Sequence, residues 1–106
     1  MSEDHEQMEL IPDDLAARLP ALYATEREAD PIAHVRLITP DSYWTWYVFE
    51  YDPAKRLCFG LVEGFEREFG YFSLDELAEA CGPLGLSIER DLYFAPSSRS
   101  TLLGKH

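Results

Sequence analysis

The side chains with the clearest chemical potential are the carboxylates between residues 63 and 79. This stretch holds six acids: Glu63, Glu66, Glu68, Asp75, Glu76 and Glu79. On a strand, Glu66 and Glu68 would project from one side about 6.6 Å apart, which matches two phosphate steps of about 3.4 Å along one DNA strand. We therefore treat Glu63, Glu66, Glu68 and Glu79 as candidate binding residues for a basic protein surface. The alternative interpretation is an ordinary solvated acidic face.

An aromatic run at residues 43–47 is the second candidate for binding. Tyr and Trp combine a large apolar area with a polar tip, and both favour protein interfaces. Tyr43, Trp44 and Trp46 are therefore candidate contact residues, with packing in the core as the alternative. A third arrangement, in which Trp44 and Trp46 line a pocket together with Tyr71, would indicate a small-molecule or catalytic function.

Residues typical of metal sites and covalent catalysis are few. His5, His34 and His106 do not have a metal-ligand spacing. Cys58 and Cys81 lie in apolar surroundings without a nearby histidine or basic cluster, so we expect two free and unreactive thiols. No calcium loop, phosphate-binding glycine loop or nucleophile elbow is present. The sequence predicts no catalytic residue, metal ligand or cofactor, and favours a binding protein over an enzyme.

Arg90 and Asp91 lie between apolar residues near the end of the chain. We expect a structural ion pair between them that holds the C-terminal segment, with Glu89 and Glu63 as alternative partners of Arg90.

Two helices are expected to position these residues. The first is predicted near residues 13–23. Its core-facing stripe, at helical spacing, consists of Leu15, Leu19, Leu22 and Tyr23. The second helix begins after Ser73, because Ser73 and Glu76 form a capping box, and it ends before Gly82.

Alternating apolar residues predict strands over 32–39, 43–51 and 57–63, with a hairpin from 43 to 63. Simple alternation places Trp44, Trp46 and Val48 on one face of the strand. It places Tyr43, Thr45, Tyr47, Phe49 and Tyr51 on the other. The segment 64–69 fits either a fourth strand or a helix. The order of elements predicts an α+β fold, an antiparallel β-meander of three to five strands with two main helices.

The 106 residues are enough for a single domain. We expect an acidic flexible arm over 1–9, the α+β domain over 10–95 and a Ser-rich flexible tail over 96–106. No apolar run approaches the ~20 residues that cross a bilayer, and the start of the chain does not resemble a secretory signal. These features predict a cytoplasmic protein that does not enter membranes.

Charge limits the partners that the chain can bind. Twenty acids against nine bases give a net charge of −11. Nucleic-acid binding depends mainly on neutralising phosphates with Lys and Arg, so we expect no direct contact with nucleic acid. The expected partner is the basic surface of another protein, and the oligomeric state stays open.

Several segments together resemble one known family. They are 19–25, 30–33, 40–47, 59–64, 70–77 and 82–94, including Trp-Thr-Trp-Tyr, Phe-Gly-Leu-Val-Glu-Gly and Gly-Tyr-Phe-Ser-Leu-Asp-Glu-Leu. The chain resembles a bacterial family of small proteins classified as a domain of unknown function. The resemblance implies no activity and no catalytic residues. It does imply an association with plasmids and integrative elements, near transfer and anti-restriction genes.

These observations lead to three hypotheses. The first is a non-enzymatic protein-binding module of a mobile element, in its most specific form a nucleic-acid mimic that acts against a host defence system. The second is a small-molecule binding or catalytic domain with an aromatic-lined pocket, which a deep pocket with a buried carboxylate or histidine would favour. The third is a structural subunit that dimerises through an edge strand or the aromatic face.

Overall fold

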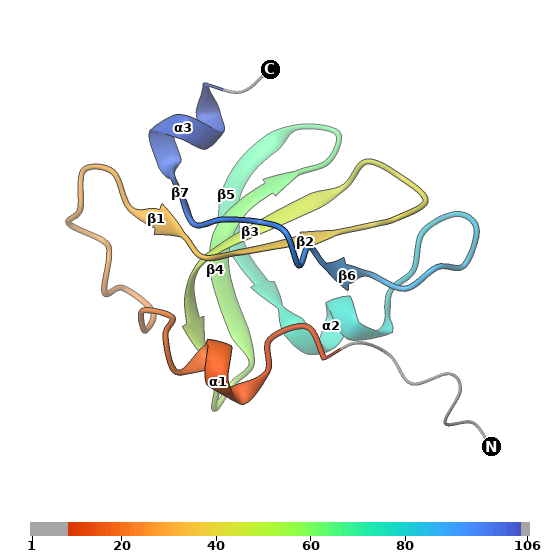
Figure 1. Cartoon of the computed structure of the whole chain (residues 1–106), viewed down its shortest axis with the longest axis horizontal. Coiled ribbons are helices and arrows are strands. Elements are labelled where there is room, and N and C mark those ends of the chain that lie inside the picture. The colour runs from red at the N-terminus through yellow and green to blue at the C-terminus, as the bar shows by residue number, and fades with distance from the viewer. Residues whose placement is uncertain (1–8, 105–106) are drawn as a thin grey trace.

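The computed structural model describes residues 9–104, and its centre is an antiparallel sheet (Figure 1). The ten elements are α1 Asp13–Ala16, β1 Ile32–Ala33, β2 Val35–Ile38, β3 Thr45–Asp52, β4 Leu57–Glu63, β5 Arg67–Ser73, α2 Leu74–Glu79, β6 Glu89–Arg90, β7 Ser97–Ser98 and α3 Arg99–Leu103. Five strands form the main sheet in the order β5-β4-β3-β2-β6, and β1 pairs with β7. The predicted α+β fold with an antiparallel sheet is confirmed.

The central hairpin follows from local turn chemistry. β3 and β4 pair from Thr45↔Glu63 to Asp52↔Leu57, and the Asp52 carboxylate accepts a hydrogen bond from the Ala54 amide at 3.0 Å in the turn. The ambiguous segment 64–69 divides at residue 67. Residues 64–66 form a turn, and β5 then returns alongside β4, so the helical alternative was wrong.

β3 contains a β-bulge that changes which side chains face the core. Val48 pairs with Gly60 and Glu50 pairs with Phe59, so Phe49 is the extra residue. A bulge of this kind places two consecutive residues opposite one. Tyr51, now opposite Cys58, therefore packs in the same core cluster as Trp46. Simple alternation wrongly predicted that Tyr51 shares a face with Phe49.

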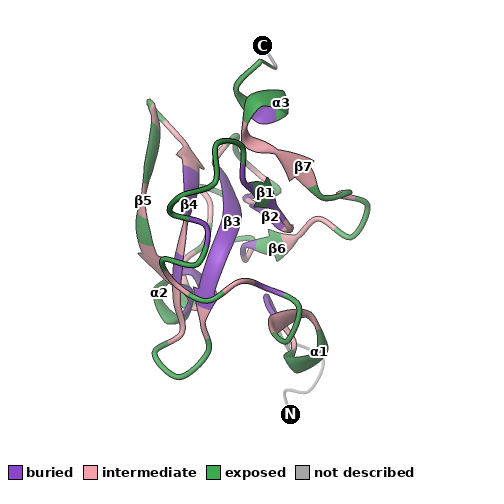
Figure 2. Cartoon of the chain, turned by 90° about the vertical axis from the view of Figure 1, so that its left-hand side faces the viewer, coloured by how far each residue is buried: buried purple, intermediate pink, exposed green. Residues whose placement is uncertain are grey.

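Both faces of the sheet are covered at its middle, and β3 is buried along its length (Figure 2). The cluster on one face contains Trp46, Val48 and Leu37, covered by Leu74 and Leu77 of α2. The smaller cluster on the other face is Ala33, Tyr47, Phe49, Leu61 and Leu102. The two-sided aromatic character of β3 thus reflects a strand with a core on each face.

Residues 97–103, within the range 96–106 expected as a flexible tail, form β7 and α3. Ser98 of β7 pairs with Ile32 of β1. The Ser98 hydroxyl caps α3 by accepting from the Thr101 amide at 3.2 Å. Leu102 is buried in the smaller core cluster. Serines that suggest disorder by composition act here as strand and cap residues. Residues 105–106 lie outside the described part, as do residues 1–8 of the expected N-terminal arm.

The two predicted helices differ in how well local signals define them. Ser73 caps α2 as predicted, because its hydroxyl accepts from the Glu76 amide at 3.2 Å. α1 is shorter than predicted and ends at Ala16. Tyr23, predicted to face the core, is instead exposed. No helix in the described range is long and apolar enough to span a membrane.

Candidate functional site: an aromatic pocket over Glu50

One cavity lies over the sheet face that carries Phe49, beneath the loop between α1 and β1. Its volume is about 400 Å³. Strands β3, β4 and β5 form its base and one wall, the loop over residues 23–31 forms another, and Arg99 at the start of α3 completes the lining. Three segments far apart in the sequence therefore build one site.

Five aromatic rings form the walls. They are Tyr23, Phe49, Phe59, Phe69 and Tyr71. Phe59 and Tyr71 have ring centroids 5.1 Å apart with planes at 56°. Phe49 and Phe69 lie 5.9 Å apart at 59°. Phe59 and Phe69 are closer to parallel, with centroids 6.4 Å apart and planes at 21°, so the rings form a cup whose walls have mixed orientations.

The aromatic rim is exposed although its base is buried. Phe69 and Tyr71 keep 41% and 51% of their surface accessible, and Tyr23 keeps 63%. Tyr23 and Tyr71 meet with ring centroids 6.3 Å apart. A side-chain hydrogen bond with Tyr23 raises the pKa of Tyr71, so the Tyr71 phenol stays neutral at physiological pH. The rim thus presents exposed aromatic rings to solvent.

Glu50 is a buried carboxylate at the base of the pocket, only 3% exposed. One of its oxygens accepts from the Tyr23 amide at 2.8 Å. The other accepts from the amide and the hydroxyl of Thr25, at 3.0 Å and 2.5 Å. Glu50 therefore anchors the loop that forms the opposite wall. The bulge at Phe49 is what directs Glu50 to this face of the sheet.

The loop held by Glu50 adopts an unusual backbone conformation. Tyr23 has φ of 72°, in the left-handed region that non-glycine residues rarely occupy. Such conformations cost about 1–3 kcal/mol and persist where surrounding contacts fix them. The bond from the Tyr23 amide to Glu50 is such a contact, and it keeps the Tyr23 ring at the mouth of the pocket.

The charges around the pocket are mostly negative. Glu26, Glu28 and the buried Glu50 line the pocket, and Arg99 is the cation among its described lining residues. Arg27 is exposed on the same loop but is not part of the lining. Arg99 is itself fixed, because its guanidinium donates to the Ala29 carbonyl at 2.7 Å. Within residues 9–104 no ion pair involves Glu50. Its charge is thus stabilised by hydrogen-bond donors alone and contributes a negative potential to the pocket.

The pocket offers binding surface more than reactive groups. The Glu50 carboxylate and the Thr25 hydroxyl are of types that take part in catalysis. However, these two residues are only 3% and 7% exposed. Their oxygens are occupied in holding the loop. A bound molecule would meet the aromatic rings, with the carboxylate acting on it through its charge.

The aromatic residues predicted for a site separate in the structure. Trp46 is buried in the main core, and Trp44 is half-buried and stacks on it with centroids 5.9 Å apart. Tyr43 is exposed on the preceding loop. Tyr71 lines the pocket over Glu50, whereas Trp44 and Trp46 line a different hollow beside Ile88. The single pocket expected from Trp44, Trp46 and Tyr71 is not formed.

The predicted acids are also divided. Glu63 pairs with Arg67 at 2.9 Å. Glu66 and Glu68 line a shallow hollow of about 310 Å³ together with Trp44 and Phe65, and Glu79 at the end of α2 is not among its lining residues. Glu66 precedes β5 and does not belong to it, so the 6.6 Å strand spacing does not apply to this pair.

Asp91 is held by a different partner from the one predicted. Its carboxylate pairs with Arg36 of β2 at 2.7 Å. A hydrogen bond from the Tyr93 amide and the pairing with Arg36 lower the pKa of Asp91. The guanidinium of Arg90 donates to the carbonyls of Glu9 and Leu10, at 2.7 Å and 2.9 Å. Both residues thus fix chain segments, in different ways.

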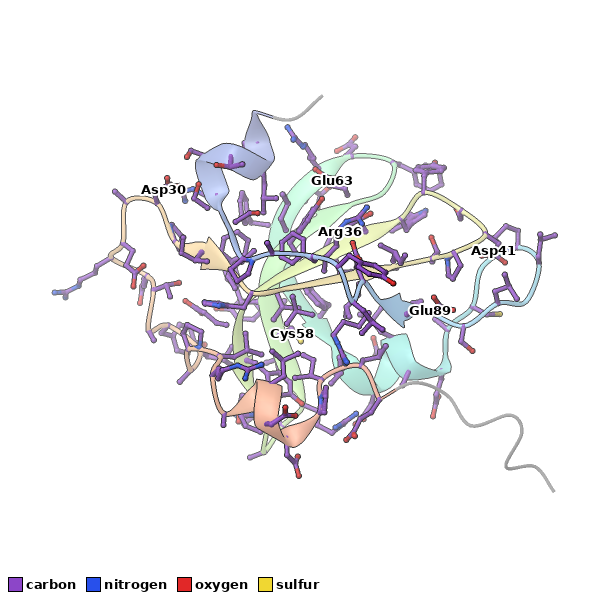
Figure 3. The ribbon with its side chains drawn as sticks, viewed as in Figure 1. Asp30, Arg36, Asp41, Cys58, Glu63 and Glu89 are labelled. Atoms are coloured by element: carbon purple, nitrogen blue, oxygen red, sulfur yellow. The ribbon has the colours of Figure 1, made fainter. Side chains whose placement is uncertain are left out.

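The two cysteines differ in exposure. Cys58 lies in the interior of the molecule (Figure 3), where burial raises its pKa to about 12. Cys81 is exposed, and both cysteines are free thiols. No group of three or more His, Cys, Asp or Glu side chains among residues 9–104 is arranged to hold a metal ion.

Sequence reasoning missed most of the pocket, including Glu50, Tyr23, Phe59 and Phe69. Glu50 did carry a signal, because it is the single charged residue in the strongly apolar stretch from Trp44 to Tyr51. A carboxylate in such a strand is rarely buried without a specific partner. The pattern therefore predicts that Glu50 has a specific partner, but it does not identify that partner.

Comparison with known protein families gives a match over most of the chain. The family described as "Protein of unknown function (DUF2958)" matches residues 10–103. No curated protein and no solved structure matches the chain.

Proposed function

The chain belongs to the DUF2958 family, whose description assigns no activity, and we propose that it is a non-enzymatic binding domain that takes a cationic ammonium group into the aromatic pocket over Glu50. The observation that carries this proposal is the combination of an aromatic cup with a buried carboxylate that makes no ion pair with another of the residues 9–104. It favours the pocket hypothesis over the other two.

The shape and electronics of the cup favour a compact cation. Aromatic rings present a negative face, and a cation within about 6 Å of a ring centroid gains roughly 0.5–2 kcal/mol. Phe59, Phe69 and Tyr71 line the same cavity, so a cation held there would lie beside more than one ring. The negative charges of Glu26, Glu28 and Glu50 act in the same direction and disfavour an anion.

A titration with two matched ligands tests the proposal. Choline and 3,3-dimethylbutan-1-ol have nearly the same shape, but only choline carries a positive charge. Amide chemical shifts of Tyr23 and Thr25 report on the pocket, because both amides bond Glu50. We expect saturable shifts with choline and a three- to thirtyfold weaker effect of the alcohol. Equal affinities for both ligands would show that the pocket binds apolar groups without any preference for a positive charge, which would refute the proposal.

Variants at the rim locate the binding. Tyr71→Ala removes an exposed ring from the pocket and should weaken choline binding several-fold. Tyr43→Ala removes a similarly exposed ring from a loop outside the pocket and should leave choline binding unchanged. Similar losses in both variants would place the ligand elsewhere.

A second candidate function is binding to a basic protein through the hollow of Trp44, Phe65, Glu66 and Glu68. The supporting observation is that Phe65, 85% exposed, meets the edge of Trp44 beside the two acids. Mimicry of nucleic acid against a host defence system, by a protein of a mobile element, is the most specific form of this candidate, and the net charge of −11 supports it.

Charge reversal tests this second candidate. We expect Glu66→Lys with Glu68→Lys to weaken the binding of polylysine by the purified domain, with the largest effect at low salt. Polylysine binding that is the same in wild type and variant, at both low and high salt, would eliminate this surface as an electrostatic site.

A further inference from the structure

The free edge of β5 lies directly beside the aromatic pocket. β5 is the last strand of the main sheet, and no strand in the described part of the chain pairs with its outer side. Figure 2 shows β5 as the outer edge of the molecule, with no ribbon beyond it. Two of the pocket's rings, Phe69 and Tyr71, belong to this strand.

The hydrogen-bond register shows which backbone groups the edge presents. The Gly64 amide donates to the Glu66 carbonyl at 3.0 Å, beside the pair Glu63↔Arg67. Glu63↔Arg67 is therefore a non-hydrogen-bonded pair. Hydrogen-bonded and non-hydrogen-bonded pairs alternate along an antiparallel ladder, so Leu61↔Phe69 and Phe59↔Tyr71 are also non-hydrogen-bonded pairs. It follows that Phe69 and Tyr71 direct their N–H and C=O groups away from β4, toward solvent.

This edge has few of the features that protect edges from pairing. Proteins usually guard an edge strand with proline, lysine, a bulge or a short length. β5 is seven residues long and pairs with β4 without a register shift, and its stretch 69–72 reads Phe-Gly-Tyr-Phe. An unguarded edge of this kind is the surface to which an extended peptide adds as a further strand.

We propose that the cationic group bound by the pocket is the side chain of a basic, extended peptide that pairs with the edge of β5. This inference rests on the proposed function and names its partner. A lysine carries its ammonium on a four-carbon stem, long enough to cross the strand spacing of about 4.8 Å. From an added strand the ammonium reaches the rings of Phe69 and Tyr71, at the mouth of the pocket.

Charge selects a basic peptide over a second copy of the chain. Each copy carries a net charge of −11, so two copies joined along β5 would repel each other. A lysine-rich strand has the opposite sign and complements Glu26, Glu28 and Glu50, the acids of the pocket.

The experiment uses a blocked hexapeptide of alternating threonine and lysine, which places all its lysines on one face of a strand. Its control is the same peptide with methylated backbone nitrogens. Hydrogen exchange at the Phe69 and Tyr71 amides is the readout. We expect the first peptide to slow both exchange rates at least tenfold, and the methylated peptide to leave them unchanged.

A matched pair of variants separates the edge from the ring. Phe69→Ala and Phe69→Pro both remove the ring, but only proline also removes the outward N–H. We expect Phe69→Ala to weaken the peptide about threefold, and Phe69→Pro to weaken it a further tenfold or more. The exchange measurement on the wild-type protein does not depend on either variant being folded.

Three results would overturn the inference. The first is peptide binding without protection of the Phe69 and Tyr71 amides. The second is choline binding without any peptide binding, which would support the proposed cation pocket but not the pairing of a peptide with β5. The third is protection that rises with protein concentration in the absence of peptide, which would make a second copy the occupant. If the peptide protects the Phe69 and Tyr71 amides but choline does not bind, the proposed cation pocket is refuted and only the pairing of the peptide with β5 is retained.

Discussion

Replacement of Glu50 by glutamine tests the architecture of the pocket at its base. The carboxylate accepts three hydrogen bonds, from two backbone amides and the Thr25 hydroxyl. Glu50→Gln keeps the volume of the side chain but puts an NH₂ donor in place of one acceptor oxygen. Either the Tyr23 amide or the Thr25 pair then faces a donor and loses its partner.

The expected cost follows from the number of donors left without an acceptor. A buried donor without a partner costs about 1–3 kcal/mol, so the free energy of unfolding should fall by about 2 kcal/mol. In a domain of about this size, 1 kcal/mol corresponds to roughly 4–8 °C in Tm. We therefore expect Glu50→Gln to lower Tm by about 10 °C, and hydrogen exchange at the Tyr23 and Thr25 amides to become faster.

Thermal unfolding followed by circular dichroism measures this change. The matched control is Glu26→Gln, an exposed acid of the same pocket, which should change stability by less than about 0.5 kcal/mol. Equal Tm values for the two variants would refute the role of Glu50 as the anchor of the loop. A large loss of Tm without faster exchange at Tyr23 and Thr25 would contradict it as well.

Two further predictions concern groups outside the pocket. In the native protein a thiol reagent such as 5,5′-dithiobis(2-nitrobenzoate) should modify Cys81 and reach Cys58 only on unfolding, because Cys58 is buried and its pKa is raised to about 12; rapid modification of both thiols in the folded state would contradict this. Asp91→Asn should lower stability at pH 7, because the Tyr93 amide and Arg36 favour the charged carboxylate and hold its pKa below the usual value. A group with a lowered folded pKa stabilises above its unfolded pKa of about 3.9 and loses that contribution as pH falls through the folded value. The stability difference in urea should therefore shrink below about pH 4, and a difference that stays constant down to pH 2 would refute the assignment.

Local signals were sufficient for the parts of the fold that local chemistry determines. The turn at Asp52 and the β-forming residues on each side of it predicted the β3–β4 hairpin. The serine cap predicted α2. In each case the deciding contacts lie within a few residues along the chain, so the sequence pattern contains them.

The bulge in β3 could not be predicted in the same way. Its position depends on how β4 aligns with β3, with Glu50 opposite Phe59. A strand taken alone shows only alternation, and one extra residue moves every later side chain to the other face. Both the core position of Tyr51 and the direction of Glu50 follow from this one feature.

The order of the C-terminal segment likewise depends on distant partners. The Ser100 amide and hydroxyl donate to the Asp30 carboxylate at 2.8 Å and 2.6 Å, and the Arg99 amide donates to the Pro31 carbonyl at 2.9 Å. Asp30 and Ser100 are 70 positions apart in the sequence. Composition alone could not indicate that a Ser-rich segment would be fixed in this way.

The pocket over Glu50 shares one residue, Tyr71, with the pocket expected from the sequence. An aromatic-lined pocket was among the hypotheses, and Tyr71 was among its expected residues. Trp44 and Trp46 were the more conspicuous aromatics in the sequence, but they pack near the opposite core. The rings that form the pocket come from β3, β4, β5 and a loop, so only the assembled sheet brings them together.

The position of a bound cation tests the central claim most directly. Isotope-filtered nuclear Overhauser spectra of the ¹³C-labelled protein with choline detect which protons lie near the N-methyl groups. We predict cross-peaks from the N-methyl protons to the rings of Phe59, Phe69 and Tyr71. Cross-peaks to Trp44 and Phe65 instead, or saturating choline without any contact to the pocket rings, would contradict the account.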